Sequence, residues 1–311
     1  FKVIPTGIEH GTVTVVATER NFEITTLRED TETDGRHAKV RFGQDWQADA
    51  ARRDFTVNAL YADSDGVVYD PLEASGTSGL VDLEAGIVRF IGDPDTRIAE
   101  DYLRVLRFFR FSAQLQPDAP DEKSLEACAR AANQNDGLSA LSGERLAQEL
   151  FKLLAQTSAP QALELMQQAG LLPFVFPFTP AVDIQIMRLA NLIDIQETHF
   201  FEADYLLRLA ALCPDSEAVI DQLSEKLRFS KKQTKRLRGA LLQVDQVEGE
   251  RGERGEYAPE VVTHGLSAYL SAEQRAARRE DHLQPAVAMQ HCGEPLDRVE
   301  RRREVRVPEA D

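Results

Sequence analysis

The spacing of apolar residues changes once along the chain, near residue 93, and this change limits the possible folds more than any other feature. Before it, residues 12–16 and 22–27 are rich in β-branched side chains and flank a short polar stretch, which predicts a β-hairpin. Two more short strands are predicted at 67–69 and 87–91. The first ninety or so residues are therefore expected to form a small, strand-rich unit.

After residue 93, apolar residues recur every three or four positions, as they do on one face of an α-helix. Residues 95–115 follow this pattern, and residues 141–154 repeat it behind Ser142, a residue type that often begins helices. Glycine and proline interrupt the rest of the chain at 170, 173–180 and 214. The sequence thus predicts an α+β chain in which a sheet-containing head is followed by helices alone.

Composition excludes several classes of protein. With 42% hydrophobic and 28% charged residues, the 311-residue chain is not disordered, and no uncharged apolar run is long enough to span a membrane. Its three cysteines lie far apart, which argues against a disulfide framework and a zinc site and favours a reducing compartment such as the cytoplasm. The net charge of −16 disfavours a nonspecific binder of polyanions, although it leaves local basic sites open.

A first candidate site follows Arg52 and Arg53. Asp54 and Asn58 are four residues apart, so on a helix they would share one face. A carboxylate beside an amide can hold a ribose hydroxyl, and the preceding arginines can meet phosphate oxygens. The alternative is a helix start, with an aspartate cap and solvated arginines.

A second candidate is the group Glu100, Asp101 and Arg104, in which the arginine would lie between two carboxylates on one helical face. Aspartate accepts hydrogen bonds and arginine donates them, which matches the edges of cytosine and adenine and rejects uracil and guanine. An ordinary surface ion pair is the alternative.

Two stretches are marked by their charge. Residues 28–35 are acidic and rich in turn formers, which predicts a mobile loop. Residues 226–238 carry seven basic residues and no acidic one, which is typical either of a solvated helical face or of a surface that contacts RNA phosphates. These residues are Lys226, Arg228, Lys231, Lys232, Lys235, Arg236 and Arg238.

Together these motifs resemble the bacterial class II tRNA nucleotidyltransferases, or CCA-adding enzymes, whose superfamily also includes poly(A) polymerases. The resemblance extends from residue 1 to about residue 177. It rests on residues 11–16, 22–28, 34–38, 52–60, 70–71 and 92–94, on Glu100-Asp101-x-x-Arg104-x-x-Arg107, and on Ser142-x-x-Arg145.

The resemblance implies a nucleotidyltransferase-type head at 1–92, a neck with a base-reading helix at 93–155, a body at 156–245 and a tail at 246–311. It implies a monomeric enzyme that uses Mg²⁺, CTP and ATP to add C, C and A to the 3′ end of tRNA. The tRNA would be bound through Lys226, Lys231, Lys232, Lys235 and Arg236.

The resemblance also implies a role for individual residues. Asp101 and Arg104 would read the base, and Glu100 would orient Arg104. The other nucleotide-binding residues would be Asp54 and Asn58 at the ribose, Arg53 at the triphosphate, and Arg107. A flexible loop containing Arg28, Asp34, Arg36 and His37 would govern the switch from C to A addition.

One departure from the family concerns the metal. Its Asp-x-Asp pair should precede Gly7, but the sequence begins at Phe1, so the head as given is N-terminally incomplete. Glu23 matches a third acidic position and is the remaining candidate for catalysis and metal binding. Asp63 and Asp65 are predicted to form a hairpin turn instead. Because two ions need more than one carboxylate, these 311 residues are expected to transfer no nucleotide by themselves.

Two alternatives stay open at this point. A poly(A) polymerase shares the head and neck, and would be recognised by its failure to use CTP. A noncatalytic tRNA-binding protein would lack the aspartate pair in its complete sequence.

Overall fold

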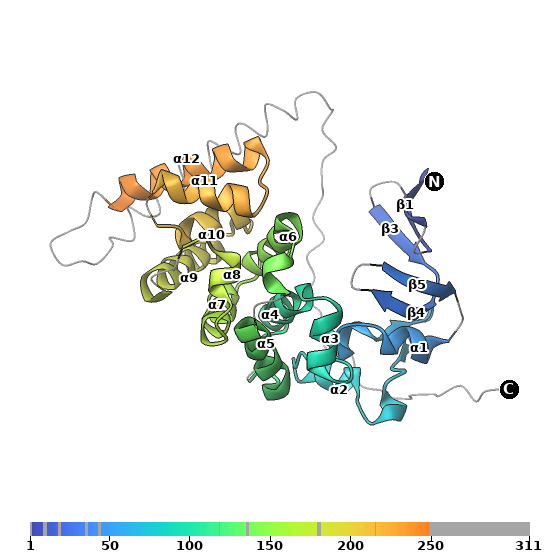
Figure 1. Ribbon diagram of the computed structural model, residues 1–311. Helices are drawn as coiled ribbons and strands as arrows, with labels where there is room; N and C mark the ends of the chain where they lie inside the picture. The colour runs from blue at the N-terminus through green and yellow to red at the C-terminus, as the bar shows by residue number, and fades with distance from the viewer. Residues whose placement is uncertain are drawn as a thin grey trace.

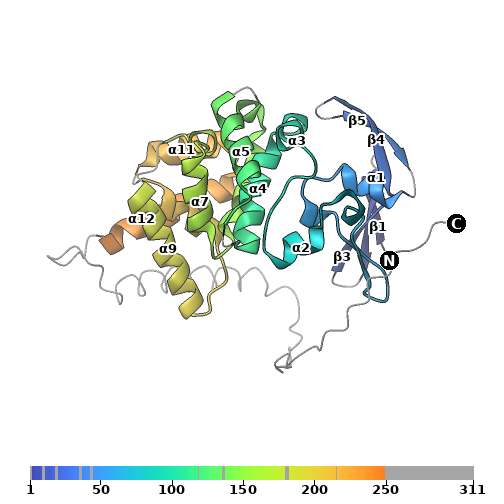
Figure 2. The ribbon, with the colours of Figure 1, turned by 90° about the horizontal axis from the view of Figure 1, so that it is seen from below.

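The protein is described here by a computed structural model that covers residues 2–8, 11–17, 20–34, 37–42, 45–117, 119–134, 137–178, 182–214 and 216–248. It is mostly helical, with small antiparallel sheets near the N-terminus (Figure 1). Figure 2 shows the strands and α1 at one end of the molecule and α9, α11 and α12 at the other, with α2 to α4 between them. The predicted α+β arrangement of a head followed by helices is confirmed.

The first sheet has the order β1 (Lys2–Gly7), β2 (Thr12–Ala17) and β3 (Arg20–Thr25). In β2 and β3, Val15 lies opposite Phe22 in an antiparallel register. This pairing confirms the hairpin predicted from the two β-branched runs.

The loop predicted for 28–35 is wrong for the residues that the structure describes. Residues Arg28–Asp34 form β4, which pairs antiparallel with β5 (His37–Phe42). An antiparallel ladder is made by backbone groups, and threonine is a good strand former, so the acidic side chains do not prevent the pairing. Arg28, Asp34 and His37 thus lie on strands, whereas Arg36 lies outside the described residues.

The rest of the head consists of short elements. α1 (Trp46–Ala51) is followed by the 3₁₀ helix η2 (Thr56–Asn58), the hairpin β6 (Tyr61–Ala62) and β7 (Val68–Tyr69), η3 (Glu73–Ser75) and α2 (Gly79–Glu84). As predicted, Asp63 lies in the β6–β7 turn, where its Oδ1 accepts hydrogen bonds from the backbone N–H groups of Asp65 and Val67, both at 2.9 Å.

The strand predicted at 87–91 is also wrong. Phe90 forms only an isolated bridge to Phe55, because both rings turn into the core. The centroids of Phe55 and Phe90 are 4.8 Å apart, and Phe108 of the following helices stacks on Phe90 at 6.0 Å. Aromatic packing against helices therefore takes the place of strand pairing here.

The single helix predicted for 95–115 is two helices, α3 (Pro94–Glu100) and α4 (Leu103–Leu115). Asp101 between them is extended, with φ −157° and ψ 104°, and its Oδ1 accepts a hydrogen bond from the backbone N–H of Leu103 at 3.1 Å. Asp101 thus ends α3, and its side chain accepts from the first backbone N–H of α4.

Helices make up the rest of the described chain, and α6 begins after Ser142 as predicted. Gly170 follows α7 with φ 74°, a left-handed conformation that favours glycine. These elements are α5 (Glu122–Gln134), η4 (Leu138–Ala140), α6 (Gly143–Leu154), α7 (Ala159–Gln168), α8 (Leu172–Val175), α9 (Val182–Thr198), α10 (Tyr205–Leu212), α11 (Glu217–Lys226) and α12 (Lys231–Glu248).

One apolar core joins the head to these helices. It begins at Phe55 and Phe90, continues through Phe108 and Phe109 of α4, and reaches Leu241 of α12. Because this core crosses from the head to the helices without a break, the residues at the start of α4 are held against the turn after α1. Among the described helices, none has the length and apolar character that a membrane span requires.

Candidate nucleotide site

Asp54 and Asn58 lie side by side, although not on one helix as predicted. Asp54 lies in a bend after α1, and Asn58 ends η2. The Asn58 Nδ2 donates to Asp54 Oδ1 at 3.0 Å, and the Phe55 backbone N–H donates to the same oxygen at 2.9 Å. The helix ends before Asp54 because Phe55 leaves it to enter the core. The predicted proximity is therefore correct, but the predicted element is wrong.

Arg107 of α4 completes this group from a distant part of the sequence. Its Nε donates to Asp54 Oδ2 at 2.6 Å, across 53 residues. Glu149 of α6 lies 3.8 Å from the Arg107 guanidinium and 2.7 Å from that of Arg110, and its side chain is only 5% exposed. Burial lowers the pKa of Arg110, and the Glu149 charge opposes that shift. Asp54 and Glu149 thus fix one face of α4 with buried charges.

Arg104 contacts Glu100 in an ion pair, as expected from their spacing. Its Nη1 also donates to the carbonyl of Arg97 at 2.8 Å, while Arg97 forms its own ion pair with Glu100 at 3.0 Å. Burial would raise the pKa of Glu100, but hydrogen bonds from Arg104 and Arg97 outweigh it and lower the pKa. The carboxylate is therefore ionised and holds Arg104 in place.

Asp101 does not share a helical face with Arg104 as predicted, because the helix breaks between them. Its Oδ2 instead accepts from Arg145 of α6, with an N···O distance of 2.6 Å. The backbone N–H of Arg104 donates to the Asp101 carbonyl at 3.0 Å, so both residues belong to one turn. The side chains are 30% and 16% exposed, which leaves both accessible from outside.

Arg53 is held by two residues outside the predicted site, Asp49 and Tyr61. Its Nη2 lies 3.0 Å from Asp49 Oδ2, and its Nε donates to the Tyr61 hydroxyl at 3.2 Å. The Asp49 side chain is 1% exposed. Asp49 and Arg53 are four residues apart in the sequence, and this spacing could have predicted the ion pair. The Arg53 side chain remains 38% exposed, so its position is fixed without being covered.

The ionisation of Asp49 and Tyr61 reflects this network. Burial would raise the pKa of Asp49, but hydrogen bonds from Tyr61, Arg52 and Arg53 and the charge of Arg52 lower it to about 2. Burial and the hydrogen bond to Asp49 raise the pKa of Tyr61 to about 12. Asp49 is thus a carboxylate and Tyr61 a neutral donor at physiological pH.

The described residues do not form a metal site. Glu23 lies on the exposed strand β3 opposite Thr14, and no group of three or more His, Cys, Asp or Glu side chains gathers anywhere in the described ranges. One carboxylate cannot hold two divalent ions. In the β6–β7 turn, Asp63 Oδ1 accepts hydrogen bonds from two backbone N–H groups.

The basic segment, residues 226–238, divides into two kinds of side chain. Lys231, Lys232 and Lys235 are exposed at the start of α12. Arg236 instead forms an ion pair with Asp204, and Arg238 forms one with Asp221 at 2.8 Å. The sequence located the cluster but could not separate these two groups.

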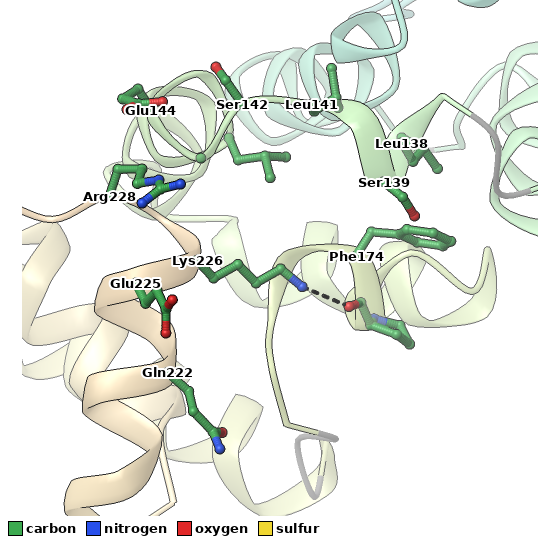
Figure 3. A pocket seen from close by; sticks show the side chains of 13 residues that line it. Leu138, Ser139, Leu141, Ser142, Glu144, Phe174, Gln222, Glu225, Lys226 and Arg228 are labelled. Atoms are coloured by element: carbon green, nitrogen blue, oxygen red, sulfur yellow. Dashed lines mark hydrogen bonds between the residues drawn. The ribbon is translucent and has the colours of Figure 1, made fainter.

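Lys226 lines a cavity of about 1110 Å³ between η4, α6, α8 and α11. Figure 3 shows its side chain reaching across the cavity, where Nζ donates to the carbonyl of Pro173 at 3.0 Å. Burial lowers the pKa of Lys226. Lys226 is thus engaged inside the fold, and this cavity is separate from the group around Asp54 and Arg104.

Two segments match known families. Residues 1–89 match the family described as the poly A polymerase head domain. Residues 119–182 match the family described as the probable RNA and SrmB-binding site of polymerase A. The first match contains Asp54 and Asn58, and the second contains Arg145 and Glu149.

Several curated relatives are similar over part of their length. The mitochondrial CCA tRNA nucleotidyltransferase 1 of Danio rerio is 39% identical over 230 residues, which is 73% of this chain and 50% of the relative. The CCA-adding enzyme of Leuconostoc mesenteroides is 41% identical over 166 residues, or 52% of this chain and 39% of the relative. The chain thus spans half or less of the length of these relatives.

Solved structures show the same fold. The Bacillus stearothermophilus CCA-adding enzyme in complex with CTP has a TM-score of 0.63 at 24% identity and covers 91% of this chain and 69% of its own. The Thermotoga maritima CCA-adding enzyme complexed with tRNA_CCA has a TM-score of 0.56 at 21% identity and covers 91% and 67%. Two segments of the chain thus match poly A polymerase families, the similar curated proteins are CCA-adding tRNA nucleotidyltransferases, and the fold is the one seen in solved CCA-adding enzymes.

Proposed function

We propose that the protein adds CMP and AMP, taken from CTP and ATP, to the 3′ end of tRNA without a nucleic-acid template. One observation carries this proposal. Asp54, which is bonded to Asn58, meets Arg107 at α4, next to the turn that contains Asp101 and Arg104. Side chains suited to bind a ribose and side chains suited to bind a base thus belong to separate segments, and they meet at one side of the head.

Base recognition would depend on Asp101 and Arg104. Glu100 holds one Nη of Arg104, and Arg145 holds one oxygen of Asp101. Aspartate retains further acceptor capacity, and arginine carries five N–H donors, so both can still bind a ligand. An acceptor beside a donor suits cytosine and adenine, whose exocyclic amino group lies beside a ring acceptor.

The rest of the nucleotide would contact residues of the head. Asn58 and Asp54 offer an amide and a carboxylate to the ribose hydroxyls, with Arg107 holding the carboxylate. Arg53 is fixed by Asp49 and Tyr61 and is partly exposed, which suits a contact with the triphosphate.

Enzymes of this family use divalent metal ions, and we assign Mg²⁺ to this reaction. Such ions activate the attacking hydroxyl and stabilise the leaving pyrophosphate. The described residues offer only Glu23 for this purpose, and one carboxylate cannot hold two ions.

The proposed tRNA contacts are Lys231, Lys232 and Lys235, because they are exposed at the start of α12. Clustered cations bind phosphates even when the whole protein is acidic. Lys226 and Arg236 make contacts inside the protein, so we assign them a smaller part in tRNA binding than the three exposed lysines. The monomeric state stays a prediction. The cytoplasmic location also stays a prediction, because some relatives are mitochondrial.

The test is incorporation of labelled CTP and ATP into tRNA that lacks its 3′ CCA end. Residues 1–311 by themselves are expected to incorporate neither nucleotide, so the assay uses the chain extended by a segment that carries the Asp-x-Asp pair. In that protein we expect two cytidines and then one adenosine, a strong loss of rate in Asp54→Asn, and little change in Asp65→Asn, an exposed turn residue. Adenosine tails formed without CTP would support the poly(A) polymerase, which the description of the head family favours. Binding of tRNA without any incorporation would support the noncatalytic alternative.

A further inference from the structure

Trp46 is the single tryptophan of the chain, and it is 52% exposed at the first residue of α1. The helix start is fixed, because the Asp45 side chain accepts hydrogen bonds from the backbone N–H groups of Gln47 and Ala48 at 2.8 and 3.1 Å. A large apolar ring is thus held at the surface by an ordered backbone.

One edge of the indole is supported by Tyr61. The two ring centroids lie 4.7 Å apart with planes at 81°, so the tyrosine packs edge to face and does not cover the indole. Tyr61 is itself fixed, because its hydroxyl donates to Asp49 Oδ2 at 2.6 Å. The Arg53 guanidinium lies over the same tyrosine ring, 5.2 Å from its centroid. An exposed ring and a cation therefore both contact Tyr61.

This pairing is typical of proteins that bind single-stranded nucleic acid. Exposed aromatic rings stack on bases, and neighbouring cations contact the backbone. Stacking tolerates any sequence because every base has a π face, which suits an RNA end whose last base changes during addition.

The position of Trp46 separates it from the base-reading turn. Arg97, which supports Glu100 and Arg104, donates to the carbonyl of Ala51 at the C-terminal end of α1. Trp46 lies at the other end of this six-residue helix, roughly 8 Å away along the axis at about 1.5 Å per residue. A base on Trp46 is thus a different base from the one near Arg104.

We propose that Trp46 is a stacking platform for a base near the 3′ end of the RNA that receives the nucleotide. This inference rests on the proposed function and adds a contact for the acceptor strand. Trp46 would bind the RNA through its exposed face, while Arg53 supplies a nearby positive charge.

Because Trp46 is the only tryptophan, its fluorescence reports on this one position. The probe is a labelled RNA hairpin with a single-stranded 3′ overhang, and its binding is measured independently by anisotropy of the label. We expect the RNA to quench Trp46 in step with binding, while CTP or ATP alone leaves the emission unchanged.

Substitutions give a second readout. Trp46→Ala should weaken RNA binding about 5- to 150-fold, the range expected for the loss of one stacked base. Trp46→Phe keeps an aromatic ring, so it should retain most of the affinity. That result would show that the site still folds. Phe200→Ala is the matched control, since Phe200 is 95% exposed after α9 and should leave binding unchanged.

Three results would overturn the inference. Quenching by CTP or ATP in place of RNA would assign the ring to the incoming nucleotide. Unquenched emission and unchanged affinity in Trp46→Ala, with RNA bound normally, would remove Trp46 from the RNA site while leaving the proposed function intact. Absence of RNA binding by anisotropy would reject both.

Discussion

The turn between α3 and α4 and the basic segment 226–238 are both densely charged, but they use charge in opposite ways. At the turn, arginines meet carboxylates from distant segments: Arg107 with Asp54 and Arg145 with Asp101. In the basic segment, three lysines are exposed at the start of α12. Charges of the first kind set the relative positions of the segments, whereas those of the second kind are exposed to solvent.

The two regions should therefore respond differently to substitution. Removing one partner of a buried ion pair leaves a charge without compensation and is strongly destabilising. Exposed charges contribute little to stability and act mainly on charged ligands. Variants of the two regions can test this division between charges that position segments and charges that act on ligands.

The largest effect on stability is expected at Glu149. Its 5% exposed carboxylate pairs with Arg110, whose side chain is 12% exposed, so Glu149→Ala leaves that guanidinium without its acid, while Arg107 keeps Asp54. The substitution should lower the free energy of unfolding by about 3 kcal/mol. Urea denaturation measures the loss. Asp221→Ala, which removes the exposed partner of Arg238, should change it by less than about 1 kcal/mol. Equal losses in both variants would contradict the division.

Asp49 shows the buried kind of charge within the head. Its pKa of about 2 lies below its unfolded value of 3.8, so it stabilises the fold fully above about pH 4, and this contribution is lost as the pH falls to 2. The difference is about 2 kcal/mol. Asp49→Asn should abolish this part of the acid dependence, measured by urea titrations between pH 5 and about 2. A wild-type acid dependence in that variant would contradict the assignment, and Asp65→Asn in the exposed turn is the control.

Arg145 should affect recognition more than stability. Its removal in Arg145→Ala frees Asp101 from the ion pair at 2.6 Å, and we expect about a tenfold loss in the preference for CTP over UTP. Competition between the two nucleotides in a binding assay measures this preference. Arg145→Lys keeps the charge and should lose less. An unchanged preference in Arg145→Ala would show that Asp101 needs no support from α6.

The smallest effect on the folded protein is expected in the basic segment. Lys231→Glu with Lys235→Glu should leave the unfolding free energy and NTP affinity unchanged while weakening tRNA binding. Each lost phosphate contact should lower the slope of log K against log salt by about 0.7–0.9. Lys123→Glu on α5, also exposed, is the control. A salt slope equal to that of the wild type would place the RNA elsewhere.

Local sequence predicted the features that depend on neighbouring residues. The hairpin of β2 and β3, the turn at Asp63 and the start of α6 follow from β-branched runs, turn formers and a residue type that often begins helices, all of which act within a few positions. The proximity of Asp54 and Asn58 follows from their spacing, although a turn and not a helix brings them together.

The errors arise where distant contacts decide the structure. The strand predicted at 87–91 is replaced by aromatic packing of Phe90 against Phe108, and the helix predicted across Asp101 is broken where that residue meets Arg145. Periodicity carries no information about partners 18 or 44 residues away. The paired state of Arg236 was hidden for the same reason, since Asp204 lies in another helix.

We propose that Asp101 and Arg104 read the base, and a measurement of nucleotide selectivity tests this role. Equilibrium binding of CTP, ATP, UTP and GTP is compared in the wild type, Asp101→Ala and Arg104→Ala, with thermal unfolding as a check on the fold. We predict that the wild type prefers CTP and ATP and that each variant loses about one to two decades of this preference, since a charged hydrogen bond contributes about 1.5–3 kcal/mol. Equal binding of all four nucleotides by the wild type, or full selectivity in both variants, would contradict the claim.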